Sequence, residues 1–177
     1  MIRSIIFTDI DDVLVLQRTV DFDKHQAASI TPKTAQQLLH KPAAEVLADL
    51  VGDGALLVIT SNWVRFLDRA GFQRMFEGAG YPALGGALHA TWSAPRAAAG
   101  TRLAAIDTWL AAHHHGEPYL ILDDTDSGTG LRGSRHDLDG RLVLCRPGTG
   151  LHAGHLPAIR AALKVLPCGK TFIPPAP

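Results

Sequence analysis

The first twelve residues, MIRSIIFTDIDD, contain the segment that decides the fold. Residues 2–7 are a short, β-branched apolar run, which predicts a strand buried on both faces of a sheet. The run ends at two carboxylates, Asp9 and Asp11, which stand two positions apart. Neighbouring acids repel one another and require a cation or a shared proton. The segment therefore predicts a buried strand with a charged site at its carboxyl end.

Two further apolar runs end in polar residues in the same way. Residues 55–59 are followed by Thr60, Ser61 and Asn62, and residues 119–122 are followed by Asp123 and Asp124. A fourth apolar run, residues 142–145, predicts one more strand. Helical spacing between the runs predicts a helical region from Thr31-Pro32 to residue 51, which Pro42 either splits into two helices or kinks and which Gly52-Asp53-Gly54 ends. It also predicts helices over residues 63–70, from residue 103 to an end near residues 113–116, and from Pro157 onward. Residues 71–100, rich in Gly and Pro, predict an irregular segment.

Alternating strands and amphipathic helices predict an α/β fold with a parallel sheet covered on both faces. In such sheets ligands collect at the carboxyl ends of the strands. The predicted acids therefore meet at one edge of the sheet, where they form a hard-oxygen site suited to Mg²⁺. No spacing of His and Cys predicts a comparable zinc site.

The composition favours a single folded domain. The chain has 177 residues and is 46% hydrophobic, with 17 basic and 17 acidic residues. We expect one domain over residues 1–170 and an extended, Pro-rich tail over residues 171–177. A net charge of zero argues against strong non-specific binding to nucleic acid or to an anionic membrane. The two cysteines, Cys145 and Cys168, are expected to be reduced thiols in a cytoplasmic protein with no membrane association.

Four segments in order resemble the motifs of the haloacid dehalogenase (HAD) superfamily. Ile-Ile-Phe-Thr-Asp9-Ile-Asp11-Asp12-Val-Leu resembles the first motif, an apolar strand followed by DxDx[T/V], and Val58-Ile59-Thr60-Ser61-Asn62 resembles the second. Leu120-Ile121-Leu122-Asp123-Asp124 resembles the acidic fourth motif. The best match to the cation of the third motif is Arg102, with Arg96 as a rival. Residues 101–126 are also similar to the small HAD domains of RNA-repair proteins.

The resemblance implies a three-layer, Rossmann-like fold with a mainly parallel sheet, and a Mg²⁺-dependent phosphohydrolase that works through an aspartyl-phosphate. It makes Asp9 the nucleophile and Asp11 the general acid, which then serves as the base that activates water. Thr60, with Ser61 as the near alternative, would bind a phosphate oxygen. Arg102 would neutralise developing charge as a fixed cation.

The resemblance also implies the metal ligands. They are Asp9, the backbone carbonyl of Asp11, and Asp124 or Asp123, with Asp124 slightly favoured. Asp126 would act through a water. The remaining substrate-binding candidates are Ser61, Asn62 and Asp12, of which Asp12 stands where the motif commonly has Gly. The cation is Arg where the motif usually has Lys, and the two side chains bind anions with different geometry.

The gaps between the motifs leave room for only a minimal cap. Residues 14–30 can hold a short flap, and residues 63–101 can hold a helix and an irregular cover. An open site suits a phosphorylated nucleic-acid end. The alternatives are a small-metabolite or nucleotide phosphatase, and a non-catalytic HAD-fold module that binds phosphate or a partner protein.

Overall fold

β1 (Ile5–Thr8) is the central strand of a five-stranded sheet with the order β3-β2-β1-β4-β5. The computed structural model describes residues 3–16, 30–94 and 100–164, and all strand pairs of this sheet are parallel. The other strands are β2 (Leu56–Ile59), β3 (Leu88–Ser93), β4 (Tyr119–Asp124) and β5 (Leu142–Cys145). The predicted α/β fold with a mainly parallel sheet is confirmed.

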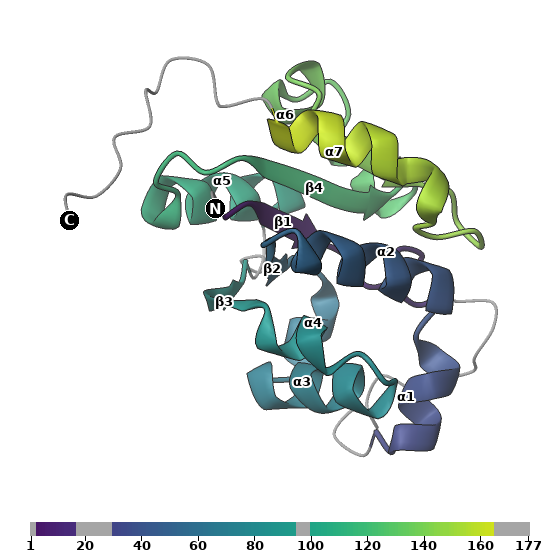
Figure 1. Ribbon diagram of the computed structural model, residues 1–177. Coiled ribbons are helices and arrows are strands. Elements are labelled where there is room, and N and C mark those ends of the chain that lie inside the picture. Colours follow the sequence, from purple (N-terminus) through teal and green to yellow (C-terminus); the bar gives the residue numbers. More distant parts are fainter. Residues whose placement is uncertain (1–2, 17–29, 95–99, 165–177) are drawn as a thin grey trace.

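Helices cover both faces of the sheet, as Figure 1 shows for α2 and α7 on one face and α5 on the other. The α-helices are α1 (Pro32–Leu38), α2 (Lys41–Gly52), α3 (Arg69–Gly78), α4 (Pro82–Gly86), α5 (Arg102–His113), α6 (Arg135–Leu138) and α7 (Leu156–Lys164). Short 3₁₀ helices are η2 (Asn62–Arg65), η3 (Ser127–Leu131) and η4 (Ala153–His155). No helix in the described parts of the chain combines the length and the apolar character that a membrane span needs.

Successive strand residues face opposite sides of the sheet and build two separate cores. Ile6 belongs to the larger core, which contains buried residues of α1, α2, α3, α4 and α7. Ile5 and Phe7 belong to the smaller core, together with Ile106 and Trp109 of α5. β1 is thus buried on both sides, which explains its continuous apolar sequence.

The register of the central strands aligns their carboxyl ends. Thr8 pairs with Ile59 of β2 on one side and with Leu122 of β4 on the other. The next residue of each strand is therefore placed at the same level of the sheet. These next residues are Asp9, Thr60 and Asp123.

The division of the first helical region is confirmed. Thr31 caps α1 through its side chain, and Pro42 lies in the first turn of α2, where its missing N–H costs no helical hydrogen bond. The end of α2 at Gly52 and the end of α5 at His113 also follow the predicted stops. The proposed tail over residues 171–177, Cys168 and the rival cation Arg96 lie outside the described residues.

Two predictions between β2 and α5 are wrong. Residues 63–70 do not form one helix, because η2 ends at Arg65 and α3 begins only at Arg69. Residues 71–100 are not an irregular cover, because they contain most of α3, all of α4 and the edge strand β3. This region therefore completes the sheet and its covering layer.

The sequence pattern did not predict β3, because β3 is an edge strand. Its residues after Leu88 are half-buried or exposed, so they lack the continuous apolar run of a central strand. The guanidinium of Arg69 donates to the carbonyls of Leu88 and His89, each at 2.8 Å. A charged side chain on the open edge protects it against pairing with another chain.

Candidate active site

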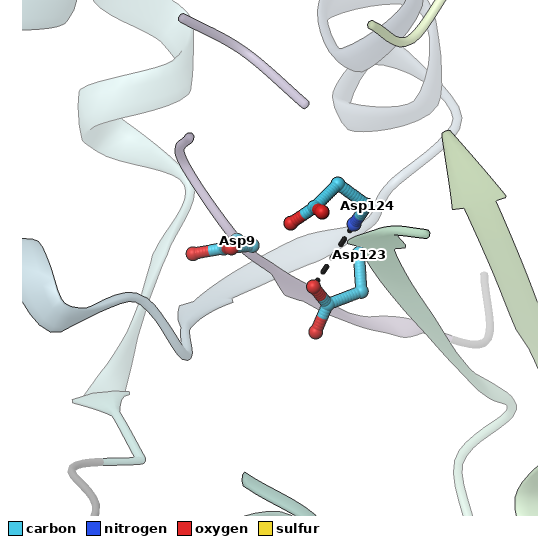
Figure 2. Close-up of side chains that lie close together, drawn as sticks. All are labelled: Asp9, Asp123 and Asp124. Atoms are coloured by element: carbon cyan, nitrogen blue, oxygen red, sulfur yellow. Dashed lines mark hydrogen bonds between the residues drawn. The ribbon is translucent and has the colours of Figure 1, made fainter. Parts of the chain in front are cut away.

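Three acidic side chains gather where β1 and β4 end. Asp9, Asp123 and Asp124 are all buried, with exposed fractions of 2%, 0% and 4%. One carboxylate oxygen of each lies within 4.8 Å of the others, and Figure 2 shows the three side chains around one small volume. Buried carboxylates at this distance repel one another strongly unless a positive charge compensates them.

Arg102 supplies one positive charge to this cluster. Its Nη1 atom lies 2.7 Å from Oδ2 of Asp9 and 2.6 Å from Oδ2 of Asp123, and the side chain is 6% exposed. Burial opposes the charge on the guanidinium, but Asp9 and Asp123 outweigh it and raise the pKa of Arg102. Arg102 is the first residue of α5, a helix capped by the side chain of Thr101, so its place beside the acids is fixed.

One cation does not compensate three acids. Burial raises the pKa of Asp123 to about 6, and the charge of Asp9 adds to this rise while Arg102 opposes it. The cluster therefore retains an excess of negative charge in its fully ionised form. Such an excess in a buried place is the electrostatic condition under which a protein binds a metal ion.

Ser127, which belongs to none of the sequence motifs, lies among the three acids. Its Oγ atom is 3.2 Å from Oδ2 of Asp9 and 3.1 Å from Oδ1 of Asp123, and it also contacts Oδ2 of Asp124. A hydroxyl has one proton and can donate it to only one of three carboxylates at a time. The point where these oxygens converge suits a small, hard cation.

Asp9 and Asp124 each offer such a cation an oxygen, Oδ2 in both cases, because both Oδ2 atoms contact Ser127. Oδ1 of Asp9 is buried and has no hydrogen-bond partner among the described residues. Oδ1 of Asp124 accepts the backbone N–H groups of Asp126 at 2.7 Å and Ser127 at 2.9 Å, which orients the carboxylate. Asp123 differs, because Arg102 binds its Oδ2 and the backbone N–H of Asp124 donates to its Oδ1 at 2.9 Å (Figure 2). The donor set fits Mg²⁺.

The two members of the first motif have separate surroundings. The carboxylate of Asp11 is half-buried, is not part of the acidic cluster, and accepts a hydrogen bond at 3.0 Å from the indole of Trp63. This arrangement agrees with a division in which Asp9 faces the acids and Asp11 stands beside them. That the carbonyl oxygen of Asp11 binds a metal stays a prediction.

The polar residues after β2 differ in their partners. Thr60 is 2% exposed, and its Oγ1 atom has no hydrogen-bond partner in the described part of the chain. Ser61 instead caps η2, since its Oγ accepts the backbone N–H of Trp63 at 3.4 Å. Asn62 is exposed. Of the two predicted hydroxyls, that of Thr60 has no partner among the described residues, while that of Ser61 accepts one hydrogen bond and retains its own proton.

Asp12 has a structural role in the turn after β1. Its φ angle is +53°, a left-handed conformation that favours Gly and explains why Gly is common there. Its Oδ1 accepts the backbone N–H of Gly148 at 3.0 Å, and its own N–H donates to the carbonyl of Val15 at 2.7 Å. Asp12 therefore connects the loop after β1 to the loop after β5.

The remaining candidates lie at the margin of the site or away from it. Asp126 is exposed, and its side chain accepts a hydrogen bond from Thr125. Cys145 is a free, buried thiol behind the acids, where burial and then the charges of Asp123 and Asp124 raise its pKa to about 12. A thiol with so high a pKa is unreactive at neutral pH.

Comparison with known proteins identifies a family. A family model described as "HAD domain in Swiss Army Knife RNA repair proteins" matches residues 5–156, which include every strand and every site residue named above. No curated protein and no solved structure matches the chain.

Proposed function

The chain belongs to the family of HAD domains in Swiss Army Knife RNA repair proteins, and we propose that it is a Mg²⁺-dependent phosphatase that uses Asp9 as its nucleophile. The observation that carries the proposal is the environment of Asp9. Its Oδ2 is bound by Arg102 and contacted by Ser127, while its Oδ1 is buried without a partner among the described residues. Oδ1 is thus the atom that can attack phosphorus.

The reaction has two steps in this proposal. Oδ1 of Asp9 forms a bond to phosphorus while the bond to the leaving oxygen breaks, and Asp11 gives that oxygen a proton. Asp11, now ionised, then takes a proton from the water that attacks the aspartyl-phosphate. The products are the alcohol released in the first step and inorganic phosphate, and both Asp9 and protonated Asp11 are regenerated.

The remaining residues stabilise charge and orient the phosphate. Arg102 holds Asp9 in place and offers a fixed positive charge to the phosphoryl oxygens. The hydroxyl of Thr60, which has no hydrogen-bond partner among the described residues, lies one strand away at the same level of the sheet and donates to a phosphate oxygen. Mg²⁺ held by Asp9, Asp124 and the carbonyl of Asp11 would neutralise charge on the phosphoryl group.

Asp124 is the better direct ligand of the two adjacent acids. Its Oδ1 is held by two backbone N–H groups, so Oδ2 faces the other acids. Asp123 is engaged through both oxygens, by Arg102 and by a backbone N–H. We therefore assign Asp124 to the metal and Asp123 to the positioning of Arg102.

Release of phosphate from an aryl phosphate tests the proposal. With Mg²⁺ present, wild type should release phosphate, whereas Asp9→Asn, which cannot act as a nucleophile, should not. Equal activity in the two proteins would remove Asp9 from this role. A beryllofluoride adduct on Asp9 would support the role independently, and its absence in the presence of Mg²⁺ would favour a non-catalytic module that binds phosphate or a partner.

A phosphorylated RNA end is the substrate class that we favour. The family description names RNA repair proteins, and a chain without net charge suits recognition of one phosphate at a time rather than capture of any nucleic acid. A screen of 3′- and 5′-phosphorylated oligonucleotides against nucleotides and small phosphorylated metabolites decides this point. Turnover of the small molecules alone would establish the metabolite or nucleotide phosphatase instead.

A further inference from the structure

A buried tryptophan holds one oxygen of Asp11. Nε1 of Trp63 donates to Oδ1 of Asp11 at 3.0 Å, across a separation of 52 residues. The tryptophan side chain is 1% exposed and belongs to the larger core. The indole N–H can only donate, and leaving it unpaired in this buried place would be unfavourable.

The position of Trp63 is fixed by its own local structure. It follows β2 inside η2, where the side chain of Ser61 accepts its backbone N–H. Its carbonyl accepts the backbone N–H groups of Phe66 and Leu67, each at 2.9 Å. The backbone and the ring are therefore both held, so the indole N–H presents a fixed donor to Asp11.

A fixed donor on Oδ1 directs the proton of Asp11 to the other oxygen. The indole bond forms with a carboxylate and equally with the carbonyl oxygen of a protonated carboxyl group. In both states Oδ1 accepts, so the transferable proton belongs on Oδ2. A general acid must be held within hydrogen-bond reach of the oxygen that it protonates.

We propose that Trp63 is the positioning residue of Asp11, holding Oδ1 through its indole N–H so that proton transfer to the leaving group proceeds through Oδ2. This inference rests on the proposed phosphatase function. Its consequence is specific, because only substrates whose leaving group needs a proton should depend on the indole bond. An alkoxide leaves poorly without a proton, whereas nitrophenolate leaves well without one.

The test compares two substrates in three proteins. The quantity measured is kcat/KM, which covers the steps up to phosphorylation of Asp9, for 4-nitrophenyl phosphate and for the best alkyl phosphomonoester, small or oligonucleotide. Trp63→Phe removes the N–H and keeps an aromatic ring. The matched control is Trp109→Phe, which likewise loses a buried indole donor, bonded at 2.9 Å to the carbonyl of Thr91 in β3 and not to the site.

Trp63→Phe should lower kcat/KM for the alkyl substrate about tenfold more than for 4-nitrophenyl phosphate, a part of the 10²–10⁴-fold that general acid catalysis contributes. Trp109→Phe should keep the wild-type ratio of the two values. If Trp63→Phe also keeps the wild-type ratio while wild type is active, the positioning role is wrong and the phosphatase function stands. If wild type is inactive on both substrates, the proposed function is wrong and the positioning role is wrong with it.

Two further variants separate positioning from folding. Benzothienylalanine at position 63 replaces the N–H by sulfur at nearly constant shape, and it should reproduce the changed ratio even if Trp63→Phe does not fold. In an Asp11→Asn background, Trp63→Phe should change the ratio no further, because the residue through which it acts is already inactive. A second tenfold change in that background would overturn the proposal.

Discussion

Nη1 of Arg102 lies 2.7 Å from Oδ2 of Asp9, and the two side chains are only 6% and 2% exposed. The proposed nucleophile is thus oriented by a buried ion pair before any substrate binds. A buried ion pair of this kind is costly to break, because the remaining charge has no solvent to stabilise it.

Arg102→Met should lower the free energy of unfolding by roughly 3–5 kcal/mol, as for other broken buried pairs. Arg160→Met is the matched control, since Arg160 pairs with Asp53 at 3.1 Å but both side chains are about half exposed (47% and 58%). That change should cost at most about 1 kcal/mol. Urea unfolding at pH 7 measures the free energy of unfolding of both variants. An equal loss in the two variants would contradict the stabilising role of the buried ion pair of Arg102.

Thr60→Val should reduce activity while leaving stability unchanged or slightly raised. The hydroxyl that is lost has no partner among the described residues, so the folded protein loses no internal hydrogen bond. A donor to the charged phosphoryl group is lost, and kcat/KM should fall at least about tenfold. Thr60→Ser retains the hydroxyl and should retain most of the activity. A Thr60→Val protein with full activity would exclude Thr60 from phosphate binding.

The effects of substitutions at Asp12 should be explained by the backbone conformation of this residue and not by a role in substrate binding. Asp12→Ala keeps the positive φ and loses the bond to Gly148, so it should cost about 1–2 kcal/mol of unfolding free energy. Asp12→Asn, which tolerates this conformation and still accepts through its amide oxygen, should remain close to wild type. Asp12→Gly should lie between them. The melting temperatures of the three variants measure this order of stability. A large rise in KM for Asp12→Asn would instead favour the substrate-binding role.

Asp123 should make the metal-free protein less stable as the pH rises. Its pKa in the folded protein is raised from 3.8 to about 6, chiefly by burial, so the folded state holds the proton more tightly than the unfolded state. The stability that this more tightly held proton contributes is fully present below about pH 4 and is lost as the pH rises through about 6. Asp123→Asn cannot titrate, and in EDTA it should therefore gain stability relative to wild type across this interval. A difference in melting temperature between Asp123→Asn and wild type that stays constant with pH would contradict the raised pKa of Asp123.

The central strands could be predicted because a strand that is buried on both faces has a continuous apolar sequence. The main site residues could be predicted because they directly follow these strands. β1 and β4 have such apolar sequences, and the polar residues that end them mark the edge where ligands bind. β3 could not be found in this way, because an edge strand that is half exposed carries a mixed sequence.

The contacts of Ser127 and Trp63 depend on geometry that no local pattern encodes. Ser127 meets the acids only because the chain turns into η3 directly after β4. Trp63 meets Asp11 only because β1 and β2 are neighbours in the sheet, although the two residues are 52 positions apart. In each case the residue type permitted several roles, and the tertiary fold selected one.

The central place of β1 also has a consequence for biosynthesis. β1 is translated before the other strands of the sheet, yet its second neighbour, β4, is translated only after α5. A nascent or truncated chain that ends before Tyr119 therefore exposes one unpaired edge of an apolar strand, a condition that promotes aggregation. We expect such fragments to need chaperones, and we expect the cluster of Asp9, Asp123 and Asp124 to assemble only when β4 has paired with β1.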